Sequence, residues 1–174
     1  MIGVSYSSIV TLNSIISTQS ITCDSQYCGF IGKLSSTTFT ITTLSISGVF
    51  SFSINSYDAG MIGYSLSSDV NMTSLTITAT MNLADGITWS GFSDNISSIA
   101  ILVGYLSGTS STFRVNNTLA TVTTNNTIWL RSINGFAQAN MTLYCYNFLS
   151  VNNFGCGHYD PAYSFSLSGS NISC

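Results

Sequence analysis

Charged residues are nearly absent from this sequence of 174 residues. They make up 5% of it, as three Lys or Arg against six acidic residues, and all of the acidic residues are Asp. A nucleic-acid-binding surface derives most of its affinity from basic side chains on phosphates, so we expect no nucleic-acid partner. Stability varies with pH only through groups that titrate differently in the folded and unfolded states. We therefore expect the fold to depend only weakly on pH.

Good helix formers are also scarce, because Glu is absent and Lys, Arg and Gln are rare. Ser, Thr, Ile, Val, Phe and Tyr abound instead, which favours an all-β fold. The longest apolar run, Ile99 to Leu106, is too short for the ~20 residues of a membrane-spanning helix, so we expect no transmembrane segment. The first residues lack a basic segment and a solid apolar core. This indicates that an export signal has already been removed. If Met1 is instead the initiator, the evidence for export is weaker.

The sequence contains no convincing catalytic or metal-binding pattern. Its single histidine, His158, lies in a glycine-rich stretch with Cys156, too close to it for a usual nucleophile and base pair. With Asp160 these residues form a crowded fragment of a metal site rather than four converging ligands. The Asp residues lie mostly in turn-like contexts and do not suggest paired catalytic carboxylates. We expect no enzyme activity, no cofactor and no metal.

A surface with so few charges must be solvated by Ser, Thr and Asn or by attached sugar, or must be covered by other subunits. Each of these three possibilities indicates a location outside the cytosol. Six Asn-x-Ser/Thr triplets are acceptors for N-glycosylation. A chain this rich in Ser and Thr would contain roughly five by chance, but most lie at predicted strand ends or loops, and we expect most to be occupied. The acceptor residues are Asn71, Asn95, Asn116, Asn125, Asn140 and Asn171.

In an exported chain the five cysteines are expected to form disulfide bonds. Pairing by sequence proximity joins Cys23 to Cys28 and Cys145 to Cys156. Cys174 is then left free or exchanged into another pairing, and the sequence alone does not choose between these possibilities.

Short strands separated by polar turns follow one another along the whole chain. The clearest alternation spans Ser74 to Leu83, while Ser98 to Leu106 is apolar on both faces and predicts a central strand. Gly48 predicts a hairpin between its flanking strands. Nothing between the strands has helical periodicity or crossover length, and we recognise no repeat of fixed period. These features predict a β-sandwich. The predicted strands span 38–46, 49–54, 61–66, 74–83, 87–89, 98–106, 113–115, 119–122, 128–130, 141–149 and 163–167.

The first segment, Met1 to Thr18, carries an apolar row at alternate positions, and no tight turn follows that would fold it back. We interpret residues 1–18 as an arm ahead of a β-sandwich head at residues 19–174. A lone strand is unstable in water, so the arm must complete a sheet in its own domain or in a neighbouring molecule, and we expect the neighbour. The donor row consists of Ile2, Val4, Tyr6, Val10 and Leu12.

The alternating arm, the strand-rich body, the glycosylation triplets and the near absence of charge together resemble the subunits of threads, the thin extracellular filaments of thermoacidophilic archaea. The resemblance implies a glycosylated β-sandwich whose open groove receives the arm of the adjacent subunit, as in donor-strand complementation. It implies a head-to-tail homopolymer at the cell surface that serves adhesion or biofilm formation.

Two other functions share this composition. One is a secreted glycan-binding or adhesive β-sandwich that uses Trp89, Trp129 and the many tyrosines. The other is a viral coat or surface-layer protein, which is also structural.

Overall fold

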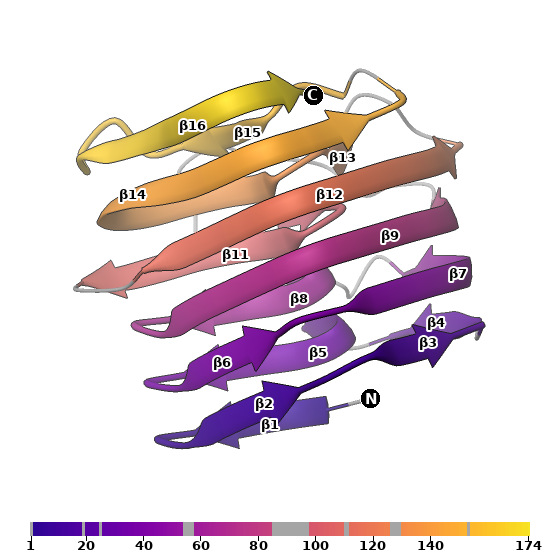
Figure 1. Ribbon diagram of the computed structural model, residues 1–174, viewed down its shortest axis with the longest axis horizontal. Coiled ribbons are helices and arrows are strands. Elements are labelled where there is room, and N and C mark those ends of the chain that lie inside the picture. Colours follow the sequence, from indigo (N-terminus) through magenta and orange to yellow (C-terminus); the bar gives the residue numbers. More distant parts are fainter. Residues whose placement is uncertain are drawn as a thin grey trace.

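The computed structural model describes residues 2–18, 20–24, 26–53, 58–84, 98–109, 112–125, 130–152 and 154–174. The described residues are almost all in strands, which confirms the all-β prediction. Every pairing between these strands is parallel, and most of them form one large sheet that curls into a half-barrel (Figure 1). The predicted β-sandwich of antiparallel sheets is therefore wrong. No helix in the described part of the chain is long and apolar enough to cross a membrane.

The strands divide between two halves of the curled sheet, and the chain passes back and forth between the halves. One half contains β1 (Ile2–Tyr6), β5 (Tyr27–Ser35), β8 (Asp58–Leu66), β10 (Ser98–Ala100), β11 (Val103–Thr109), β13 (Leu130–Arg131) and β15 (Gly157–Tyr159). The other contains β2 (Ile9–Leu12), β3 (Ile15–Ser17), β4 (Ile21–Cys23), β6 (Thr38–Ile41), β7 (Leu44–Phe52), β9 (Asp69–Leu83), β12 (Phe113–Thr124) and β16 (Phe165–Ser173). The long strand β14 (Asn134–Ser150) runs through both halves.

The chain thus winds as a parallel β-solenoid, in which each coil lies on the one before it. Along the first half Ile2 pairs with Ile31, Ile31 with Ile62 and Ile62 with Val103, which are steps of 29, 31 and 41 residues. In Figure 1 the coils rise from the N-terminal end at the bottom to the C-terminal end at the top. The return path between parallel neighbours is a strand of the other half. Parallel pairing therefore needed no helical crossover, and this is why the absence of helices misled the sequence argument.

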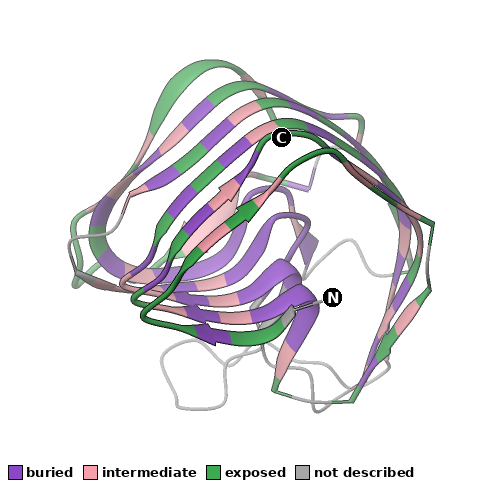
Figure 2. Cartoon of the chain, turned by 60° about the horizontal axis from the view of Figure 1, so that its bottom comes forward, coloured by how far each residue is buried: buried purple, intermediate pink, exposed green. Residues whose placement is uncertain are grey.

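The core is built from columns of apolar side chains that stack from coil to coil. Alternate residues of the second half point inward, so that buried and more exposed positions alternate along β9 and β12 (Figure 2). The alternation breaks once in each strand, at Thr73–Ser74 and at Asn116–Asn117. Each buried Phe, Leu, Ile or Met of these columns contributes at most about 1.5–3 kcal/mol by leaving water. The three columns are Val10, Phe39, Val70, Phe113, Leu143 and Leu167; Leu12, Ile41, Met72, Val115, Cys145 and Gly169; and Ile15, Leu44, Leu75, Thr118, Phe148 and Ile172.

The long strands β12, β14 and β16 each contain an asparagine with a positive φ at an equivalent position. Asn117, Asn147 and Asn171 have φ values of 54°, 50° and 55°, a left-handed conformation that Asn tolerates better than most residues. Asn147 Nδ2 donates to Asn117 Oδ1 at 2.9 Å, and Asn171 Nδ2 donates to Asn147 Oδ1 at 2.8 Å. This asparagine ladder joins the last three coils along their outer surface.

A column of glycines runs through the first half, and it marks a repeat that the sequence argument missed. Gly3 and Gly32 lie side by side, flanked by the pairs Ile2 with Ile31 and Val4 with Lys33, and the column continues through Gly63, Gly104 and Gly135. A Cβ on Gly32 would collide with the Gly3 carbonyl oxygen, so only glycine fits between these coils. Gly48 ends no strand, because β7 continues through it, and the hairpin predicted there does not form.

Candidate assembly interface at the two ends of the solenoid

The residues predicted to form a donor strand lie at the N-terminal edge of the chain's own sheet. Residues 2–6 pair with β5 and residues 9–12 pair with β6, so they form part of the first coil. Val10 and Leu12 point toward the core and are half-buried, whereas Val4 and Tyr6 are 50% and 62% exposed. The backbone of Ile2 pairs with Ile31. Insertion of these residues into a neighbouring molecule stays a prediction.

This N-terminal edge exposes much more apolar surface than the donor residues alone. Ile9 is 83% exposed and Ile16 is 81% exposed, both on the outer side of the edge strands. Ile15 is half-buried, because it starts a core column and has a neighbour, Leu44, on one side only. Ile15 and Ile16 lie within the predicted arm but outside the predicted donor row. The position of Ile15 at the start of a core column follows from the coil step of 29 residues, which is not evident from the alternation alone.

The C-terminal edge consists of β15 and β16, and it ends the same core columns. Both strands pair with β14 alone among the described strands. Phe165, Leu167 and Ile172 are half-buried against the core, as their counterparts at the N-terminal edge are. The solenoid therefore presents an incomplete core layer at each end, rather than a cap of polar side chains.

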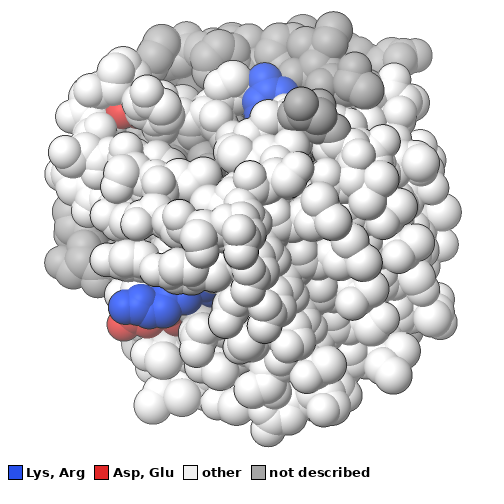
Figure 3. All heavy atoms as spheres, turned by 45° about the horizontal axis from the view of Figure 1, so that its top comes forward, with Lys and Arg blue, Asp and Glu red and all other residues white. Residues whose placement is uncertain are grey.

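In the described part of the chain, β1 to β4 and β16 lack the charged residues and prolines by which natural sheets avoid pairing with other chains. Monomeric proteins protect edge strands with charged residues, proline or covering segments. Strands β1 to β4 contain no Asp, Glu, Lys, Arg or Pro, and β16 contains none either. With the C-terminal end turned toward the viewer, the surface is almost entirely uncharged (Figure 3). Both edges are thus open to further parallel pairing.

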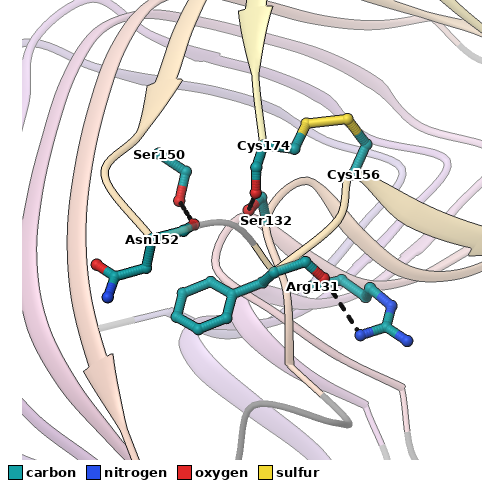
Figure 4. The surroundings of a disulfide bond; sticks show 7 residues. Arg131, Ser132, Ser150, Asn152, Cys156 and Cys174 are labelled. Atoms are coloured by element: carbon teal, nitrogen blue, oxygen red, sulfur yellow. Dashed lines mark hydrogen bonds between the residues drawn. A yellow bond between two sulfur atoms is a disulfide. The ribbon is translucent and has the colours of Figure 1, made fainter.

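The disulfide bonds fasten coils to one another at both ends. The predicted bond between Cys23 and Cys28 is confirmed, and it joins β4 to the start of β5. The predicted pairing of Cys145 with Cys156 does not form, because the structure joins Cys156 to Cys174 (Figure 4). Cys145 lies inside a core column, fully buried, where burial raises the pKa of its thiol to about 12. Two disulfide bonds indicate folding in an oxidising environment, as in secreted proteins.

The bond between Cys156 and Cys174 holds the C-terminal edge strand in place. The Cys174 carbonyl also accepts hydrogen bonds from the Phe154 amide at 2.8 Å and from Ser132 Oγ at 3.0 Å (Figure 4). The bond spans 18 residues, against 5 for Cys23 and Cys28. We predict that Cys174→Ser lowers the free energy of unfolding by about 3 kcal/mol and Cys23→Ser by about 2 kcal/mol, because the longer loop loses more entropy when closed.

Chemical denaturation of both variants and the parent chain measures this difference. Cys145→Ala is the control for loss of a cysteine outside a disulfide. Dithiothreitol should destabilise the Cys174→Ser variant only by the contribution of the remaining bond between Cys23 and Cys28. An unchanged stability in Cys174→Ser would contradict the assignment of this pair.

Beside this disulfide lies His158, within β15 of the C-terminal edge. Arg131 Nε donates to His158 Nε2 at 2.7 Å, and Arg131 also donates to the carbonyls of Leu130 at 2.9 Å and Phe154 at 3.3 Å. Burial and the nearby Arg131 charge together lower the pKa of His158. Desolvation also lowers the pKa of Arg131. The imidazole accordingly acts as a neutral acceptor at the end of the solenoid.

Aromatic rings form a stack along the first half of the sheet. Tyr27, Tyr64, Tyr105 and Phe136 stack in turn, with centroids 5.2, 5.2 and 6.0 Å apart. The Lys33 ammonium lies 4.9 Å from the ring centre of Tyr27 and 5.0 Å from that of Tyr64. The faces of these rings are thus largely occupied by one another and by Lys33, which leaves little for a sugar to stack on. Trp89 and Trp129, the two tryptophans suggested for glycan binding, lie outside the described residues. Tyr146, Tyr159 and Tyr163 are exposed outside this stack.

Four of the six glycosylation acceptors are exposed, but their carboxamides differ in their contacts. Asn125 Nδ2 donates to the Leu83 carbonyl and its Oδ1 accepts from the Leu83 amide, both at 2.8 Å. Asn171 belongs to the asparagine ladder. Asn116 is half-buried, and its Oδ1 is buried without a hydrogen-bond partner. Asn71 and Asn140 are exposed, and Asn140 Oδ1 accepts from the Ser164 amide at 2.8 Å. Asn95 lies outside the described residues.

No family model, curated protein or solved structure matches the chain.

Proposed function

We propose that this protein is a structural subunit of an extracellular filament, which polymerises when the C-terminal coil of one copy pairs with the N-terminal coil of the next. The observation that supports this most directly is the match between the two edges of the solenoid. Both are unprotected parallel edges that end the same core columns. A second copy is thus the partner that each edge fits best.

The match can be followed along each column. Continuing the register by one coil places Val10 of the next copy beside Leu167, and Ile15 of the next copy beside Ile172. In the column between them Leu12 comes to lie beside Gly169. All of these positions meet apolar or small side chains, as they do between coils within one chain. The joint would therefore repeat the packing that already holds the solenoid together.

Such a joint is heterologous, because it brings two different surfaces together. Heterologous contacts that do not close into a ring extend without limit and give a filament. Each half-buried column residue that becomes fully buried contributes at most about 1 kcal/mol, and new backbone hydrogen bonds along the edges add to this. The loss of translational and rotational freedom opposes association, so we expect polymerisation to depend steeply on concentration.

Sedimentation velocity of the full-length chain over a range of concentrations tests this proposal. We expect linear polymers of increasing length above a critical concentration, visible as thin rods by electron microscopy. A single monomeric boundary at every concentration would overturn the proposal.

Glycans on the outer surface of the coils would solvate such a filament without blocking its ends. We predict that Asn71 and Asn140 carry N-glycans in the native protein, while Asn125 does not, because its carboxamide holds Leu83 through two hydrogen bonds. Mass spectrometry of peptides from the secreted protein gives the occupancy of each site. Thr73→Ala removes the Asn71 acceptor and should remove the mass of one glycan only. An occupied Asn125 would contradict the prediction.

A further inference from the structure

The C-terminal edge contains the chain's only histidine, His158, in the strand that would meet the next copy. Its backbone is fixed as well as its ring, because Asn134 Nδ2 donates to the His158 carbonyl at 2.8 Å. Its side chain is half-buried in the single chain. In the proposed filament, strand β1 of the next copy would lie against β15 and remove more of the remaining solvent.

The contact with Arg131 requires a neutral imidazole. Nε2 can accept a hydrogen bond only through its lone pair, and Arg131 Nε occupies that lone pair at 2.7 Å. Protonation would remove the acceptor and place two positive charges at hydrogen-bond distance. The Arg131 side chain also donates to the Phe154 carbonyl, in the segment that leads to the disulfide-bonded Cys156. Displacement of Arg131 would therefore disturb several contacts of this end.

Among the described residues, few other titratable groups surround this pair. Strand β14, on which β15 lies, has none in its facing segment from Asn134 to Gln138. Asp160 is occupied elsewhere, because its two carboxylate oxygens accept from Gln138 Nε2 at 3.0 Å and from the Ala162 amide at 2.9 Å. Tyr159 lies beside His158 and Tyr163 lies near Asp160, and the cysteines nearby are joined in a disulfide. On the next copy, β1 would bring Tyr6 as its single titratable residue.

We propose that protonation of His158 weakens the joint between subunits, so that the filament grows at neutral pH and shortens in mild acid. This regulation rests on the proposed end-to-end assembly. His158 binds fewer protons in the joined state than at the free end, because the joint buries the imidazole further from solvent and so favours its neutral form. Association is therefore strongest above the pKa of the free end. It weakens as the pH falls through the window between that pKa and the lower pKa of the joined state, and then becomes constant.

The size of the effect follows from the same linkage. Each unit by which joining lowers the pKa of His158 weakens association in acid by about tenfold. We therefore expect the critical concentration of the full-length protein to rise by about tenfold between pH 7.5 and pH 4.5.

Measurement of the critical concentration by sedimentation from pH 4.5 to pH 8 tests the inference. His158→Gln is the decisive variant, because its amide oxygen can accept from Arg131 but cannot take up a proton. We expect it to assemble as the parent does at pH 7.5 and to keep that critical concentration at pH 4.5. An equal response to pH in both proteins, or none in the parent, overturns the role of His158 while assembly itself stands. No assembly at any pH overturns the proposed function and this regulation with it.

Discussion

A mixture of two end-blocked variants is expected to form heterodimers and nothing longer. Ile15→Lys places a charge in the core column of the N-terminal edge, and Leu167→Lys does so at the C-terminal edge. Each variant alone should stay monomeric, because burial of a lysine without a partner in the joint is costly. The first variant still has an intact C-terminal edge and the second an intact N-terminal edge. One joint between them remains possible, and it cannot be extended.

Mass photometry or sedimentation of the two variants, apart and mixed, measures this outcome. The matched control is Thr78→Lys, which adds the same charge on the exposed outer face of a middle coil and should polymerise as the parent does. Heterodimers in the mixture would also show that each blocked variant still folds at its intact end. Long polymers from either variant alone would contradict the proposed joint. A mixture that stays monomeric while the circular dichroism of both variants is native would contradict it equally.

Alanine at two positions of the glycine column is expected to affect the stability of the fold differently. The Cβ of Gly32→Ala would meet the Gly3 carbonyl oxygen of the preceding coil, where backbone cannot easily move aside. We expect a loss of about 2–3 kcal/mol, which for a chain of this size lowers the melting temperature by roughly 5–10 °C. A Cβ on Gly3 meets nothing within 4 Å in the single chain. Gly3→Ala should therefore leave the melting temperature of the monomer unchanged.

The same substitution should nevertheless impair assembly. Gly3 occupies in the first coil the position that Gly32 occupies in the second, so in the filament its Cβ would point toward the last coil of the preceding copy. We expect Gly3→Ala to raise the critical concentration at least tenfold without destabilising the fold. Differential scanning calorimetry of the dilute monomer and sedimentation of the concentrated protein separate the two effects. Normal assembly of Gly3→Ala would show that this edge does not pack closely against another copy.

The sequence predicted many of the strands, although not β5, and it did not predict their arrangement. Alternation identified Ser74 to Leu83 as a strand, and it lies within β9 with its apolar residues buried. The apolar run at residues 98–106 is buried at Ile99 and Val103, but it is divided between β10 and β11 rather than forming the single strand predicted. Alternation says only that a strand has one buried face, however. It is equally compatible with antiparallel sandwiches and with parallel coils.

The repeat that distinguishes the two was present but irregular. The pairs Ile2-Gly3, Ile31-Gly32, Ile62-Gly63 and Val103-Gly104 begin equivalent turns of the solenoid, but the longer step of 41 residues between the last two obscures the period. The arm at residues 1–18 is the first of these coils, and its alternation is that of an edge coil. The pairing of Cys156 with Cys174 depends on which coils are adjacent, so sequence proximity could not predict it.

The axial repeat of the filament tests the central claim most directly. Among the described residues, one half of the sheet has six successive layers, which contain β1, β5, β8, β11, β14 and β15, and parallel strands lie about 4.8 Å apart. Cryo-electron microscopy of the filament should therefore show an unbroken parallel sheet with a subunit rise of about 29 Å, and with residues 2–17 of each copy in their own first coil. A map in which these residues leave their own chain and insert between strands of the neighbouring copy would contradict end-to-end stacking and would support donor-strand exchange instead.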